Sequence, residues 1–498
     1  MTFSTRRRLV ASLFSACAVA AIGLASAAYR QSATPDRTGT LRLHPCELPG
    51  IAGGGRCGTL DVYENRPAGT GRQIGLNIVV VPALGATSAP EPVFWLEGGP
   101  GAAATQAVGP VSGQYLRGLR ADHDLVFVDQ RGTGTSNPLK CDDIGETPAN
   151  LDAYFGKLFP IDLVRACRGK LEKVADLTRY STSIAMDDLD EVRRALGYEK
   201  IHLAGASYGT LAAQVYMRQH PDRVRSAFLV GVATPGFRLP LPFARAAQNA
   251  LDHLFADCAA DPVCRAAFPS LRDEFAAVLA RFDRGSIDVQ MVDPATGQRR
   301  SVALERESYV ERLRALLYST HGARFIPLVV HRAFLRDFGP FQTLATRYTL
   351  GGPGASRGMY FSVTCSEMMP FITEEEIVAE TRGTFLGDRR VRAHMAACGE
   401  WPRAHVPRRF LDPVRSAVPV VLFSGDADGA TPPWIAEAAV GFLSNGRQIK
   451  APHTGHQIDG PCTWDLMQAF IRNPSVRQLD AACVEKSHRP PFATAISP

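Results

Sequence analysis

Ser207 has the sequence surroundings of a nucleophile. It is the central residue of Gly205-Ala206-Ser207-Tyr208-Gly209, which follows the apolar run 201–204 and precedes a helix-like stretch at 210–216. A strand-to-helix turn this tight strains its central residue and leaves no room for Cβ atoms beside it, so glycines are required there. The strain raises the hydroxyl above the sheet edge, and the pattern therefore predicts a nucleophile elbow.

A serine hydroxyl needs an imidazole to take its proton and a carboxylate to orient that imidazole. With this type of elbow, the acid and then the base follow the serine along the chain. The apolar run 419–423 leads into Ser424-Gly425-Asp426-Ala427-Asp428. Asp428 is the preferred acid and Asp426 the alternative. A calcium loop is rejected because its remaining ligands are missing.

The candidate base lies after a further short strand at 448–451. Two histidines compete in the segment Pro452-His453-Thr454-Gly455-His456. Gly455 allows a sharp backbone turn directly before His456, which suits a side chain that must reach back across the sheet edge. His456 is therefore preferred, and His453 is the alternative.

The oxyanion of such a reaction requires backbone donors. The apolar run 93–96 is followed by Glu97-Gly98-Gly99-Pro100-Gly101, whose glycines let N–H groups approach a developing negative charge. The N–H of Gly99 is the expected first donor. The N–H of Tyr208, directly after the nucleophile, is the expected second donor.

Strands and helices alternate on both sides of these residues, which predicts an α/β fold with a mostly parallel, doubly wound sheet. The alternation stops between about 236 and 405, where helical patterns dominate and predict an inserted cap. The predicted organisation is a signal peptide at 1–27, a first core part at 28–235, a mainly helical cap at 236–405 and a second core part at 406–498.

Several of these motifs together resemble one known family. They are Gly98-Gly99-Pro100-Gly101, the segment Asp129-Gln130-Arg131-Gly132-Thr133-Gly134-Thr135-Ser136, the elbow, the acid loop and Gly455-His456. This combination resembles the proline iminopeptidase and tripeptidyl aminopeptidase branch of the α/β-hydrolases. The resemblance implies an α/β-hydrolase fold and a secreted serine exopeptidase, with Asp428 and His456 at the family's acid and base positions. Glu97 replaces the histidine common in iminopeptidases, which favours the tripeptidyl-type relatives.

A cap that closes one side of the cleft would admit only a chain end to Ser207. An exopeptidase also benefits from a carboxylate that pairs with the α-ammonium of its peptide substrate. Glu367, in Thr364-Cys365-Ser366-Glu367, is the candidate for this pairing, and a structural acid is the alternative.

The first residues have the pattern of a signal peptide. Arg6, Arg7 and Arg8 precede an apolar segment at 9–24 and the A-x-A site Ala25-Ser26-Ala27. The arginines also resemble a twin-arginine signal. A membrane anchor is the alternative, but the segment is short and rich in alanine. We therefore expect export to the periplasm or the medium, with no stable membrane insertion of the mature chain.

The cysteine count agrees with export. The chain has 11 cysteines, and cleavage of the signal peptide would remove Cys17 and leave an even number, which favours disulfides. The sequence alone leaves the pairing open, but pairing between neighbours is the least costly and fits the family spacing. It gives Cys46–Cys57, Cys141–Cys167, Cys258–Cys264, Cys365–Cys398 and Cys462–Cys483.

Composition excludes some other classes of function. The net charge of +6 falls to about +3 without the signal arginines, which is too weak and dispersed for nucleic-acid binding. Cys and His residues are not clustered as metal ligands, so neither a metal nor a cofactor is expected. The remaining alternatives to a peptidase are a carboxylesterase or lipase on the same fold and a non-catalytic binding protein.

Overall fold

The computed structural model describes residues 41–86, 88–141, 144, 150–294, 296–348, 355–457 and 460–496. The predicted signal peptide at 1–27 lies outside these residues. Nine described strands form one sheet in the order β1-β2-β3-β5-β4-β6-β7-β10-β11. Their bounds are β1 His44–Cys46, β2 Gly55–Tyr63, β3 Gln73–Val81, β4 Val93–Leu96, β5 Leu125–Val128, β6 Ile201–Ala206, β7 Val224–Val230, β10 Val420–Gly425 and β11 Gly446–Ala451.

The strands from β5 to β11 in this order are parallel, whereas β1, β2 and β3 are antiparallel additions at one edge. The expected mostly parallel sheet is thus confirmed. The N-terminal antiparallel strands were not expected. Their alternation of buried and exposed residues, clear in β2, is typical of strands with one solvated face.

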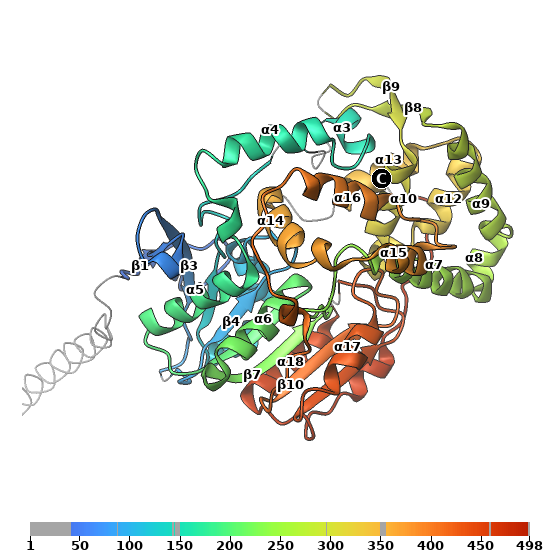
Figure 1. Cartoon of the computed structure of the whole chain (residues 1–498). Coiled ribbons are helices and arrows are strands. Elements are labelled where there is room, and N and C mark those ends of the chain that lie inside the picture. The colour runs from blue at the N-terminus through green and yellow to red at the C-terminus, as the bar shows by residue number, and fades with distance from the viewer. Residues whose placement is uncertain are drawn as a thin grey trace, which may run out of the picture.

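Helices cover both faces of the sheet (Figure 1). Helices α5 (Thr182–Ala195), α6 (Tyr208–Gln219) and α17 (Pro433–Val440) share one hydrophobic core with the first face. Helix α18 (Pro461–Arg472) packs on the opposite face. Because parallel strands place their carboxyl ends at one edge, the loops after β4, β6, β7, β10 and β11 meet there.

Most of the remaining helices lie between β7 and β10 in the sequence and gather beside the sheet (Figure 1). They are α7 Phe243–Ala260, α8 Pro262–Ala267, α9 Leu271–Arg281, α10 Arg306–Leu317, α11 Thr320–Ala323, α12 Ile326–Phe334, α13 Gly339–Arg347, α14 Arg357–Glu367, α15 Glu374–Thr381 and α16 Arg389–Gly399. A two-stranded antiparallel hairpin, β8 (Ile287–Val292) and β9 (Arg299–Leu304), interrupts them. The helical patterns indicated most of this region but not the hairpin.

A separate hydrophobic core joins the helices from α7 to α13 and the hairpin, whereas α14, α15 and α16 pack into the core shared with the first face of the sheet. The separate core also contains Leu151, Tyr154 and Phe155 of the short helix α3 (Leu151–Phe155), which precedes the elbow in the sequence. The other described α-helices are α2 (Val108–Pro110) and α4 (Ile161–Leu171). The limits of the cap remain a prediction, and α3 shows that its packing extends beyond one continuous segment.

All five expected disulfide pairs are present in the structure. In the part of the chain that the structure describes, no helix combines the length and the apolar character needed to cross a bilayer.

Candidate active site

The turn around Ser207 has the strained geometry that the motif predicts. Ser207 has φ 54° and ψ −123°, between the end of β6 and the first residue of α6. A Cβ on Gly205 would lie 2.9 Å from the carbonyl oxygen of Gly209, and one on Gly209 would lie 2.1 Å from that of Leu96. Real Cβ contacts do not come this close, so β6, α6 and β4 can meet here only through glycines.

Asp428 and His456 are joined by a short hydrogen bond. The Nδ1 atom of His456 lies 2.8 Å from Oδ2 of Asp428, and both side chains are buried. Oδ1 of Asp428 accepts from the N–H groups of Ala430 and Thr431, at 2.7 and 2.8 Å, and the Thr431 hydroxyl donates to Oδ2. Because a carboxylate oxygen accepts, this contact suits a Nδ1–H group that donates to Asp428 and leaves Nε2 as the second ring nitrogen.

The alternative base and the alternative acid, His453 and Asp426, do not take part in this hydrogen bond. His453 is about half exposed, and its Nδ1 lies 3.2 Å from Asp257 on α7. Among the described residues, the carboxylate bonded to the His456 imidazole is that of Asp428 and not that of Asp426. The structure therefore brings together the preferred residues.

Two neighbours of His456 were missed by the sequence reasoning. Gly231, directly after β7, has φ +63°, and a Cβ there would lie 3.0 Å from Cε1 of the imidazole. The ring of Tyr318, after α10, makes an edge contact with the imidazole at a centroid distance of 4.9 Å. Gly231 could have been found from the sequence, since it follows a strand whose carboxyl end reaches the same sheet edge. Tyr318 has none.

The glycine loop after β4 lies against the nucleophile. A Cβ on Gly98 would lie 3.0 Å from Cβ of Ser207. Gly99 has φ +113° and lines the same cavity as Ser207. Tyr208 is the first residue of α6, where a backbone N–H has no partner within the helix. The loop and the helix end are thus both adjacent to the hydroxyl, as the expected donors Gly99 and Tyr208 require.

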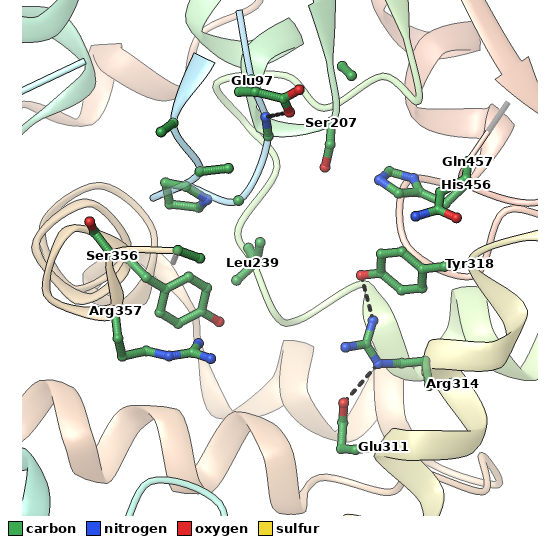
Figure 2. A pocket seen from close by; sticks show the side chains of 18 of the residues that line it. Glu97, Ser207, Leu239, Glu311, Arg314, Tyr318, Ser356, Arg357, His456 and Gln457 are labelled. Atoms are coloured by element: carbon green, nitrogen blue, oxygen red, sulfur yellow. Dashed lines mark hydrogen bonds and ion pairs between the residues drawn. The ribbon is translucent and has the colours of Figure 1, made fainter. Parts of the chain in front are cut away.

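Ser207 and His456 face a common cavity of about 670 Å³ (Figure 2). Residues from the elbow, the glycine loop and the helices of the predicted cap line it, including Leu239, Tyr318 and Arg357. The charged side chains in its described lining, apart from His456, are Lys157, Arg312, Arg314, Arg357, Arg390, Glu97 and Glu311. The serine therefore opens onto a partly open cavity whose described lining has an excess of cationic groups.

Glu367 is not in the described lining of this cavity. It is fully buried at the end of α14, where its carboxylate accepts from the N–H and the hydroxyl of Thr182, at 2.5 and 2.6 Å. Thr182 begins α5 and in turn contacts the hydroxyl of Tyr208 at 2.7 Å. Burial raises the pKa of Glu367 to about 7. This placement matches the alternative interpretation of Glu367 as a structural acid.

One group among the described residues has the composition of a metal site. Potential ligand atoms of Cys365, His394 and Cys398 lie within 4.8 Å of one another. The two cysteines are joined in a disulfide, so neither offers a thiolate to a metal ion.

Comparisons with known proteins agree with this architecture. A family model described as alpha/beta hydrolase fold matches residues 91–458. The chain is 26% identical over 428 residues to the serine protease Hip1 of Mycobacterium tuberculosis, covering 77% of this chain and 78% of that protein. It is 29% identical to the tripeptidyl aminopeptidase of Streptomyces lividans over 36% of each chain. It is 28% identical to the proline iminopeptidase of Neisseria gonorrhoeae over 28% of this chain and 32% of the other.

Proposed function

The chain belongs to the α/β-hydrolase family, and we propose that within it this protein is an exported serine exopeptidase. It would release N-terminal residues or short peptides through an acyl-enzyme. The family match supports a hydrolase. The similarity to a serine protease and two aminopeptidases supports, more narrowly, a serine peptidase.

The observation that carries the proposal is the shared cavity of Ser207 and His456, with the imidazole bonded to a buried Asp428. In the proposed reaction, Nε2 of His456 takes the proton of Ser207 while the oxygen attacks the substrate carbonyl. Asp428 holds the imidazole and stabilises its positive charge. The N–H groups of Gly99 and Tyr208 stabilise the oxyanion. The C–N bond then breaks as His456 protonates the leaving amine.

Water completes the proposed cycle. His456 takes a proton from a water molecule that attacks the acyl-enzyme ester, and Ser207 recovers its proton when the acid leaves. This chemistry involves no cofactor. Exopeptidase action is supported by the cap helices in the cavity wall, because a cavity that is walled on one side favours a chain end over a continuous polypeptide. Export is supported by the signal-peptide pattern and the five disulfides.

Replacement of the nucleophile tests the proposed chemistry. We expect Ser207→Ala to abolish both turnover and covalent labelling by a fluorophosphonate, read by mass spectrometry of the intact protein. Ser444→Ala, which changes an exposed serine outside the cavity lining, serves as the control and should label like the unmodified protein. Labelling that persists in Ser207→Ala would contradict the assignment.

A substrate panel tests the exopeptidase part. It consists of prolyl, alanyl and tripeptidyl anilides, each with a free and with an acetylated N-terminus. Free amines should be cleaved and blocked ones should not. Equal rates on both forms would show that the chain end is not recognised.

One observation favours the alternative of a carboxylesterase. The cavity's cationic side chains outnumber its acidic ones among the described residues, and Glu367 does not line it. An α-ammonium entering this space would be repelled. Short acyl esters therefore belong in the same panel.

A further inference from the structure

Two arginines lie across the cavity from Ser207 in Figure 2, and two more line the same cavity. Arg314 comes from α10 and Arg357 from the start of α14, and Figure 2 shows both side chains reaching toward the cavity from opposite sides. Arg312 on α10 and Arg390 on α16 complete the cluster. Three helices separated in the sequence thus bring four arginine side chains to the lining of one cavity, and we call these four residues the arginine wall.

A single buried carboxylate counters this cluster in the described lining. Oε2 of Glu311 accepts from Nε of Arg314 at 2.9 Å and from Arg390 at 2.8 Å. The other lining acid, Glu97, belongs to the glycine loop, where it accepts from Trp95 and from the N–H of Gly98. The described part of the arginine wall therefore keeps a net positive charge.

The hydrogen bond that Arg312 donates goes to a neutral group. Its guanidinium lies 3.5 Å from the ring centroid of Tyr154 and donates to the carbonyl oxygen of that residue at 2.9 Å. Its Nε atom is buried without a hydrogen-bond partner in the structure. Arg357 lies over the ring of Tyr360, 4.8 Å from its centroid. Aromatic faces stabilise cations but leave the net charge unchanged.

Burial makes these cations costly. It lowers the pKa of Arg357 to about 10, and the nearby positive charge of Arg390 lowers it further. Burial also lowers the pKa of Arg312. Arginine nevertheless stays cationic at neutral pH. An anion entering the cavity would replace part of the water that the Arg312 guanidinium has lost.

We propose that the arginine wall selects substrates whose acyl group carries a carboxylate. The carboxylate would belong to an acidic side chain in the released peptide, or to a dicarboxylic acid if the substrate is an ester. The proposal rests on acyl transfer at Ser207. It concerns the acyl group because an exopeptidase holds the released residues in its cavity and leaves the remaining chain outside.

Matched substrates that differ only in charge test this. The peptide arm compares tripeptidyl anilides with Glu or Gln at the first, second or third position. The ester arm compares the p-nitrophenyl half-ester of adipic acid with the corresponding adipamic ester. For the favoured position we expect kcat/KM to be at least about tenfold higher for the carboxylate, equivalent to about 1.4 kcal/mol. The preference should weaken with added salt.

Substitutions of the cavity arginines test which residues cause the preference for a carboxylate. Arg312→Gln and Arg357→Gln should each lower the carboxylate-to-amide ratio at least about threefold, since each removes one interacting charge. Arg357→Lys keeps the charge and should retain more of the ratio, which separates charge from misfolding. Arg272→Gln on α9 is the control, because that residue is more than half exposed, lies outside the cavity lining and should not change the ratio.

Binding to Ser207→Ala supplies a readout that needs no turnover. By calorimetry, adipate should bind this variant more tightly than adipamide. Equal or weaker binding, or a ratio at or below one in the active enzyme, would overturn the inference while leaving acyl transfer intact. Failure of phosphonate labelling at Ser207, with tighter adipate binding retained, would instead refute the proposed function and leave the anion site standing.

Discussion

At the scale of single residues, the candidate site depends on glycines as much as on its polar groups. Gly231 contributes no functional atom, yet its missing side chain is the space that the His456 imidazole occupies. Its φ of +63° also lies in the left-handed region, where an L-residue costs about 1–2 kcal/mol. Space and backbone conformation thus both require glycine at this position.

We expect Gly231→Ala to lower kcat at least about tenfold, because the new methyl group must displace the imidazole from Ser207, and misplacement of a reacting group is costly. Steady-state kinetics measure the loss of activity, and thermal unfolding measures the loss of stability. Gly69→Ala is a matched control, since Gly69 has φ +59° and nothing within 4 Å of its Cβ position. If both variants lose stability equally and neither loses activity, the contact with His456 is unimportant.

At the scale of elements, Glu367 connects three helices. It ends α14, accepts from the first N–H of α5 and, through Thr182, reaches Tyr208 at the start of α6. The N-cap residue of α5, Ser181, makes no side-chain cap bond, so the carboxylate of Glu367 takes over this role. The acid is therefore part of the support of the elbow helix.

Glu367 should make stability depend on pH. Burial raises its pKa from 4.5 to about 7. Between these values the unfolded chain has released the proton and the folded chain still holds it. The free energy of unfolding therefore falls as pH rises through this window, by about 3 kcal/mol at 1.36 kcal/mol per pKa unit, and it stays constant above it.

Glu367→Gln tests this contribution, because an amide can replace both hydrogen bonds without ionising. Urea unfolding at pH 5 and pH 8 should show a smaller difference between the two pH values in the variant. Glu437→Gln, at an exposed position of α17, controls for general charge effects. An unchanged pH difference in Glu367→Gln would mean that Glu367 is ionised in the folded protein.

At the scale of the whole molecule, helices inserted between the two halves of the sheet form much of the cavity wall. Tyr318 joins the two parts, because its ring contacts His456 and its carbonyl accepts from the N–H of Gln457 at 2.6 Å. Disulfides stiffen this arrangement. Cys365–Cys398 links α14 to α16, which carry Arg357 and Arg390 of the arginine wall.

Two disulfides of this region have very different loops, 33 residues for Cys365–Cys398 and 6 for Cys258–Cys264. Loop-closure entropy predicts that replacing the longer pair by serines costs about 1.5 kcal/mol more stability than replacing the shorter one. All four cysteines are buried, so the two double variants are matched in burial. Urea unfolding gives the comparison, and equal losses would show that native packing outweighs loop entropy.

The sequence by itself determined the features that depend on local chain geometry. The Gly205–Gly209 turn, the strands at the sheet centre and the order of Ser207, Asp428 and His456 follow from spacing and periodicity over a few residues. Neighbour pairing also matched the disulfides. The antiparallel strands β1–β3 and the β8–β9 hairpin were not predicted, because the direction in which strands pair depends on contacts between segments and not on the period within each strand.

Only the tertiary structure decided what surrounds those residues. It removed Glu367 from the cavity, placed Tyr318 against His456 and gathered four arginines from three helices onto one wall. Such groupings depend on which helix faces meet across the insertion. That choice is made by packing between segments far apart in the chain, and no local pattern of residue types encodes it.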